Sequence, residues 1–96
     1  MTAPTIGVLT LYIHVENSHS LKEKRHVVKS LKDRLRAHFN VSVAEIDGLE
    51  SWQHSVVAAV TVANDRVYAT QILSAVEAHA AGILGGSLTG TSVDWL

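Results

Sequence analysis

The sequence predicts an α+β protein built from one four-stranded antiparallel sheet and two helices. Apolar residues alternate in some segments and recur at helical spacing in others, in the order strand, helix, strand, strand, helix, strand. The 96 residues suffice for one domain, so we expect a single domain over residues 1–96. Right-handed crossovers fold this order into a ferredoxin-like domain with both helices on one face of the sheet.

The first strand is expected over residues 6–16, where apolar side chains take every second position. A polar break follows, and Ser20 with Glu23 three residues later forms a capping box that satisfies free amides at a helix start. The first helix is therefore expected from residue 21 to about residue 38. Its apolar arc comprises Leu21, Val27, Val28, Leu31, Leu35 and Phe39.

The next two strands, residues 41–47 and 54–63, are separated by about six residues, which predicts an antiparallel hairpin. Asn64 or Asp65 then caps a second helix over about residues 66–81. The residues of this helix expected to face inward are Val67, Ile72, Val76 and Ala80.

Glycines shape the end of the chain. Gly82 is expected to end the second helix, because glycine is a poor helix former. Residues 83–96 contain three further glycines among Ser, Thr and Val. They are expected to form the last strand, at an edge of the sheet and bulged at glycine.

Charge is distributed unevenly along the chain. The formal net charge is −1, yet seven of the eight lysines and arginines lie within residues 22–36. With Glu23 and Asp33 this segment carries +5, and the remainder carries −6. Projection at about 100° per residue places five cations on one helical stripe about 21 Å long. They are Lys22, Arg25, Lys29, Lys32 and Arg36. Lys24 instead points toward the apolar arc, where its stem packs while its amine reaches solvent.

This stripe has three interpretations. As a functional site it binds a polyanion, and RNA is favoured over DNA because no DNA-reading motif is present. As a structural feature it is the solvated face of an amphipathic helix, a role that Lys and Arg suit by propensity. In a homodimer it is neutralised by an acidic loop of the second copy, formed by Glu45, Asp47 and Glu50.

Two tryptophans are candidate interface residues. Trp52, in the loop before the third strand, either folds back over the end of the hairpin, which is the commoner outcome, or anchors an interface. Trp95 at the terminus either packs on the edge strand or contacts a second copy.

The residues give little support for a metal, a cofactor or catalysis. Cysteine is absent, so no thiolate can act as nucleophile or ligand, and the six histidines are scattered without metal-ligand spacing. Ser18, His19 and Ser20 can be drawn as nucleophile and base, but Ser20 is already explained as a helix cap. We therefore expect no metal, no cofactor and no enzymatic activity.

Nothing in the sequence indicates export or insertion into a membrane. The apolar run that begins at Ile6 is interrupted by Thr10 and His14, and no basic segment precedes it. We expect a cytoplasmic protein with no membrane partner.

Several stretches resemble the YlxP-like family of uncharacterised bacterial proteins. They are HSLKEKR at residues 19–25, VVKSL at 27–31, FNVSVAE at 39–45, Trp52-Gln53 and Asn64-Asp65. The resemblance extends over nearly the whole chain to about Val76. It implies a ferredoxin-like domain of unknown biochemical function. Family members are commonly encoded beside translation initiation factor two and ribosome-binding factor A, which implies a role in ribosome assembly or translation.

Taken together, these observations favour a small non-enzymatic protein that associates with ribosomal RNA or the ribosome through its basic first helix. The alternative is a homodimeric protein-interaction or small-ligand regulatory module with no nucleic-acid role. The two differ in which partner meets the stripe, RNA or a second copy of the chain.

Overall fold

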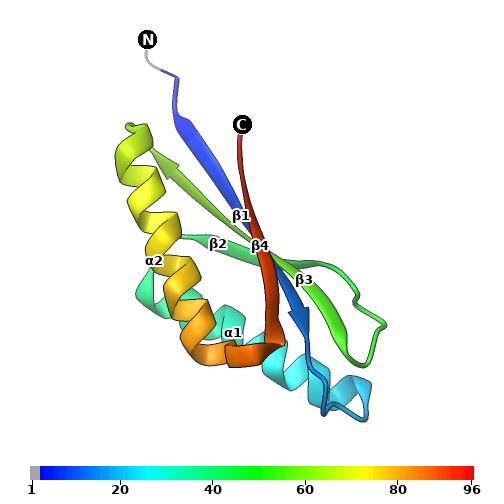
Figure 1. The fold of residues 1–96 in the computed structure, drawn as a ribbon. Coiled ribbons are helices and arrows are strands. Elements are labelled where there is room, and N and C mark those ends of the chain that lie inside the picture. The colour runs from blue at the N-terminus through cyan, green and yellow to red at the C-terminus, as the bar shows by residue number, and fades with distance from the viewer. Residues whose placement is uncertain (1–2) are drawn as a thin grey trace.

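The computed structural model describes residues 3–96, which form a four-stranded antiparallel sheet and two long helices (Figure 1). The elements follow the predicted order, with a short 3-10 turn (η1) before the last strand. Their bounds are β1 Thr5–His14, α1 Leu21–His38, β2 Ser42–Asp47, β3 His54–Ala63, α2 Arg66–Leu84, η1 Gly85–Ser87 and β4 Leu88–Trp95. The ferredoxin-like architecture predicted from the sequence is confirmed.

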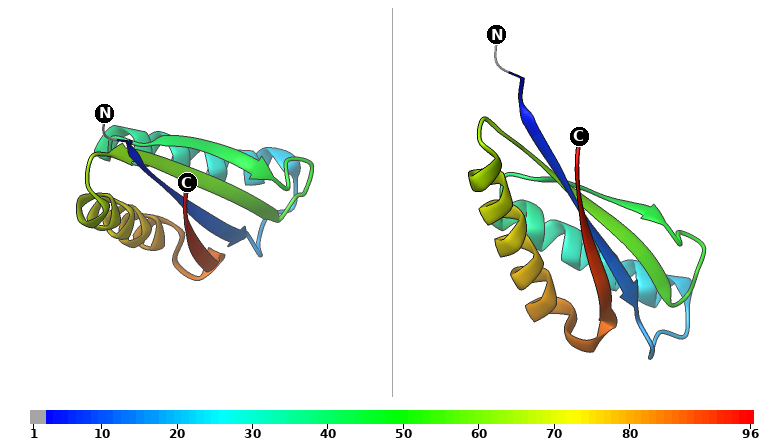
Figure 2. Two further views of the ribbon diagram at one scale, coloured as in Figure 1. Left: turned by 90° about the horizontal axis from the view of Figure 1, so that it is seen from above. Right: turned by 45° about the horizontal axis from the view of Figure 1, so that its top comes forward.

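The strands lie in the order β2-β3-β1-β4, so β1 and β3 form the centre and β2 and β4 form the edges. β1 pairs with β3 along its whole length, from Thr5 opposite Ala63 to His14 opposite His54. Both helices lie on the same face, and in both views of Figure 2 the opposite face has no helix over it. The sheet thus has one covered face and one open face.

The covered face forms the core. Leu9, Leu11 and Ile13 of β1 alternate inward as predicted and are buried. They pack with Val57 and Ala59 of β3 and with residues of both helices in one continuous cluster. The helix residues of that cluster are Val28, Leu31, Leu35, Leu73, Val76, Ala80 and Leu84.

Both helix starts have the predicted cap residues, but Glu23 reaches back to the amide of His19 and not to that of the cap residue Ser20. The Ser20 hydroxyl accepts a hydrogen bond from the Glu23 amide at 3.1 Å, and the Glu23 carboxylate accepts one from the His19 amide at 2.7 Å. Asp65 caps α2 by accepting a hydrogen bond from the Tyr68 amide at 2.9 Å. These contacts satisfy amides that have no partner within the helix, and so fix where each helix begins.

Two predictions for α2 are wrong. The helix continues through Gly82 to Leu84 and ends at Gly85, whose φ of 55° is a backbone conformation that favours glycine. Val67 is 64% exposed, because the buried positions follow the spacing 69, 73, 76, 80 and 84. Val67 lies outside that arc, on the side of the helix away from buried Ala69.

The last strand, β4, lies at an edge as predicted and is irregular beside a glycine. Tyr12 pairs with Gly90 and Ile13 pairs with Leu88, so Thr89 is an extra residue between them. Farther along, Trp95 pairs with Gly7, where a Cβ would lie 2.7 Å from the indole ring. Glycine at position 7 therefore makes room for Trp95 to pack against the sheet.

Candidate functional site

Four of the five cations of the predicted stripe line one groove between α1 and β2. The groove has a volume of about 370 Å³. We call it the basic groove, and its lining residues are Arg25, Val28, Lys29, Lys32, Asp33, Arg36 and Glu45. Lys22, the fifth cation, is exposed on the first turn of α1, outside this lining. Helical spacing thus predicted the cations on α1. The opposite side of the groove is formed by Glu45 of β2, which helical spacing cannot predict.

Asp33 is the carboxylate that partly neutralises the basic groove. Its Oδ2 accepts a hydrogen bond from Lys29 Nζ at 2.6 Å, and its Oδ1 lies 3.6 Å from Arg36 Nη1. The hydrogen bond from Lys29 is the main cause that lowers the pKa of Asp33 below its ordinary value. Within residues 3–96, no ion pair involves Lys22 or Lys32. These two ammonium groups are therefore available to an external anion.

The far end of the basic groove is tied to the edge strand. Arg36 Nη2 donates a hydrogen bond to the carbonyl oxygen of Val43 at 2.7 Å. This contact orients the guanidinium along the groove and leaves its other N–H groups to Asp33 and to a ligand. Arg is suited to such a position, because its planar donors can grip two phosphate oxygens at once.

Lys24 differs from the prediction, because its amine does not reach solvent. The side chain is 0% exposed, and Nζ donates to Glu45 Oε2 at 2.8 Å and to the Gly48 carbonyl oxygen at 2.7 Å. Glu45 also accepts a hydrogen bond from the Ser55 hydroxyl. A buried ammonium is retained only when it is paired and hydrogen-bonded, and both conditions are met here.

The ionised form of Glu45 is favoured in the folded protein. Burial by itself raises the pKa of this carboxyl. The hydrogen bonds from Lys24 and Ser55, with the charge of Lys24, outweigh burial, so the pKa of Glu45 lies below its ordinary value. Glu45 is therefore paired chiefly with Lys24, and its charge also attracts Lys32 of the basic groove.

The predicted acidic loop is wrong for Glu45, which is paired with Lys24 within the same chain. Glu45 lies in β2 and not in a loop, and its side chain is 12% exposed, so a second copy cannot use it to neutralise the stripe. Asp47 and Glu50 are exposed, the first at the end of β2 and the second in the hairpin loop. Glu50 Oε1 lies 3.9 Å from Arg25 Nη2 within the same chain. An exposed pair at that distance contributes little, about 0–1 kcal/mol.

Trp52 is 59% exposed, so the expectation that it folds back over the hairpin is wrong. Its loop is joined to α1 chiefly by the hydrogen bond from Lys24 to Gly48. Trp52 follows Glu50 by two residues in that loop, and it is not among the residues that line the basic groove. Trp95, in contrast, packs on the edge strand, and the guanidinium carbon of Arg66 lies 4.0 Å from the centre of a Trp95 ring.

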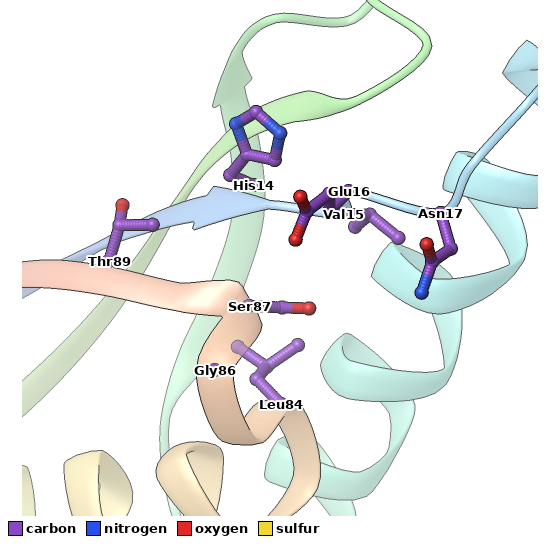
Figure 3. Close-up of a pocket in the computed structure, with 8 residues that line it drawn as sticks. All are labelled: His14, Val15, Glu16, Asn17, Leu84, Gly86, Ser87 and Thr89. Atoms are coloured by element: carbon purple, nitrogen blue, oxygen red, sulfur yellow. The ribbon is translucent and has the colours of Figure 1, made fainter.

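A second cavity, of about 530 Å³, opens between the end of β1 and η1 (Figure 3). Its lining residues are His14, Val15, Glu16, Asn17, Leu84, Gly86, Ser87 and Thr89. Figure 3 shows the Ser87 hydroxyl and the Glu16 carboxylate bordering the same space. No local pattern in the sequence predicts this cavity, because its two halves lie about 70 residues apart in the chain and only the β1–β4 pairing joins them.

The serines and histidine considered as a nucleophile and base have structural contacts. Ser18 is buried, and its hydroxyl donates to the Ser20 carbonyl oxygen at 3.0 Å. Ser20 caps α1, and His19 is exposed.

Among residues 3–96 there is no group of three or more His, Asp or Glu side chains placed to hold a metal ion. In the same part of the chain, neither helix is long and apolar enough to cross a bilayer.

Solved structures with similar backbones show the same fold. The de novo designed protein Foldit4 superposes with a TM-score of 0.59 at 10% identity, covering 98% of this chain and 97% of that one. A C-terminal segment of the alpha subunit of aIF2 from Pyrococcus abyssi gives a TM-score of 0.53 at 15% identity. That match covers all of this chain and 52% of the other. At these identities the likeness concerns the fold alone.

Sequence comparisons establish the family. The chain is 32% identical over 90 residues to the uncharacterized protein YlxP of Bacillus subtilis strain 168. The aligned region covers 94% of this chain and 98% of that protein. A family model matches residues 6–92, a range that includes the whole basic groove. The resemblance drawn from the sequence is confirmed, and the chain belongs to the family described as proteins of unknown function, DUF503.

Proposed function

We propose that this protein is a non-enzymatic, cytoplasmic RNA-binding protein that associates with ribosomal RNA through its basic groove. The observation that carries the proposal is the gathering of Arg25, Lys29, Lys32 and Arg36 on one groove, while Glu45 is held by Lys24. Two carboxylates line the groove with these four cations: Asp33, and Glu45, which is paired with Lys24. Such a surface attracts a polyanion before any specific contact is made.

Phosphate is the chemical group that fits these side chains. Lysine supplies a mobile point charge and arginine a planar fork of donors, and both bind phosphate oxygens. The cations from Arg25 to Arg36 span eleven residues of helix, which is about 16 Å at 1.5 Å per residue. That length suits a few consecutive phosphates of one strand.

Trp52 supports single-stranded RNA over a duplex. Its exposed indole lies in the loop that Lys24 joins to α1, and an aromatic ring is a surface on which an unpaired base stacks. A base in a duplex is already stacked on its neighbours and gains nothing from this ring. The proposal therefore assigns phosphates to the basic groove and one unpaired base to Trp52.

The experiment measures binding of the purified protein to single-stranded RNA, and its co-sedimentation with ribosomes, over a range of salt concentrations. Four phosphate contacts on a single strand predict a slope of log K against log salt of about −3. No RNA binding and no co-sedimentation at low salt would overturn the proposal. Binding that is insensitive to salt would contradict the assignment to phosphates.

A further inference from the structure

The open face of the sheet is apolar although no element covers it. Antiparallel partners share a face, so the residues opposite one another on β1, β3, β2 and β4 define it. On the central strands it consists of apolar residues over most of its length, namely Ile6, Val8, Tyr12, Val56, Ala58, Val60 and Val62. An antiparallel sheet with one solvated face normally alternates apolar inside and polar outside. β3 departs from this pattern on both faces. Its polar residues Ser55 and Thr61 face the core, and its outward positions are apolar.

Apart from Thr10, which lies opposite Ala58 on β3, the polar groups of this face lie towards its rim. His14 and His54 lie at one end, with ring centres 4.4 Å apart. Asp47 and Asp94 lie on the two edge strands. None of the four strands contains a lysine or an arginine. The face thus has an apolar centre and a polar rim, which is the anatomy of a protein–protein interface.

The absence of cations from the strands decides the kind of occupant. Nucleic acid requires lysine or arginine for its phosphates, and a membrane surface is bound through basic residues beside apolar ones. Two carboxylates on the rim repel both. A flat, apolar and uncharged centre instead matches an identical centre on a second copy of the chain.

The size of the face also suits a dimer. The four strands have 10, 6, 10 and 8 residues. With strands about 4.8 Å apart and about 3.4 Å per residue, the face measures about 550 Å² per copy, or about 1,100 Å² in total. Specific protein–protein interfaces begin at about 1,000 Å².

We propose that two copies of this chain associate through the open faces of their sheets, with Val8, Ala58 and Val60 at the centre. The two sheets pack face to face, and the helices of each copy lie on the outside. Each basic groove remains open, because it lies between α1 and β2 on the helical side. The proposal is independent of RNA binding, since it uses none of the residues that line the basic groove.

The test is the mass of the protein in solution, measured by light scattering and sedimentation equilibrium over a wide concentration range at low and high salt. The expected mass is twice the 10.4 kDa of the chain, and it is retained at high salt because the interface is apolar. Val60→Lys is expected to give a monomer. Val67→Lys, at an exposed valine on the helical side, is the matched control and is expected to remain dimeric.

Three outcomes overturn the proposal. They are a wild-type monomer at every concentration, a dimer that dissociates at high salt, and a dimer that survives the open-face substitution. A dimer sensitive to salt would place the contact on the charges of α1 instead. If Val60→Lys fails to fold by circular dichroism, Val62→Lys replaces it, because Val62 is 61% exposed and tolerates a charge in the monomer.

Discussion

The ammonium nitrogen of Lys24 lies 2.8 Å from Oε2 of Glu45, and no part of the Lys24 side chain is exposed to solvent. This ion pair joins α1 to β2, and the bond from Lys24 to Gly48 joins α1 to the hairpin loop. It sets the distance between the two walls of the basic groove. It also takes up much of the negative charge of Glu45, which acts in addition on Lys32.

The pair predicts strong coupling between its two members. Glu45→Gln leaves a buried ammonium without a counter-charge, and Lys24→Met leaves a carboxylate in a largely buried position. Each single substitution is expected to lower the free energy of unfolding by about 3 kcal/mol. The double variant is expected to lose less than the sum, because it removes both buried charges. Urea unfolding of all four proteins measures the coupling. Additive losses would show that the two groups do not interact in solution.

Stability is expected to depend on pH through Glu45. Its pKa in the folded protein lies below the ordinary value of 4.5, so its contribution is complete above about pH 4.5 and is lost as pH falls through the lower folded value. The midpoint of thermal unfolding should therefore fall in acid, and less steeply in Glu45→Gln. Glu50→Gln is the control, because Glu50 is exposed and its pair with Arg25 contributes little, so its loss should leave the acid profile close to that of the wild type. Identical profiles for the wild type and Glu45→Gln would refute this assignment.

Two glycines are expected to respond in opposite directions to alanine. Gly48 has a φ of 77°, and a Cβ there would lie 2.6 Å from the His54 carbonyl oxygen, so Gly48→Ala should destabilise by about 1–3 kcal/mol. Gly82 is helical with open space around it, so Gly82→Ala should stabilise by about 0.5–1 kcal/mol. Thermal unfolding of both variants checks the pair. A destabilised Gly82→Ala would contradict the extension of α2 to Leu84.

Trp52 is expected to distinguish single-stranded from duplex RNA. Trp52→Ala should weaken binding of single-stranded RNA about tenfold, since stacking of one base contributes about 1–3 kcal/mol. Trp52→Phe should retain most of the affinity for single-stranded RNA, because phenylalanine can also stack on a base. The affinity for duplex RNA should change little in either variant. Fluorescence anisotropy with labelled RNA of both kinds measures the difference. An equal loss for both kinds of RNA would show that Trp52 does not stack on an unpaired base.

The sequence was sufficient for the architecture and for the cations of the groove. Three of the features used were local: the arc from Val28 to Leu35, the capping box at Ser20 and the alternation in β1. Each depends on residues close together in the chain and is present in the structure. Lys24 was placed correctly against the core, but its partner Glu45 lies 21 residues away, and nothing local specifies that contact. The amine was therefore wrongly expected to reach solvent.

The remaining differences also arise from contacts distant in sequence. Gly82 was expected to end α2 because glycine is a poor helix former, yet burial of Leu84 extends the helix by one more turn. Trp52 was expected to cover the hairpin, but it is 59% exposed, in a loop that the hydrogen bond from Lys24 to Gly48 joins to α1. The second cavity requires the pairing of β1 with β4, which no segment of the chain encodes alone.

The most direct test of the basic groove compares two charge reversals on the same helix. Lys32 lines the groove, whereas Arg34 lies on the opposite flank of α1 and is exposed. Binding of single-stranded RNA at low salt is measured for Lys32→Glu and Arg34→Glu. We expect Lys32→Glu to weaken binding about tenfold and to reduce the salt slope by about 1, with little change in Arg34→Glu. Equal effects of the two substitutions, or no effect of either, would contradict the claim that the groove binds RNA.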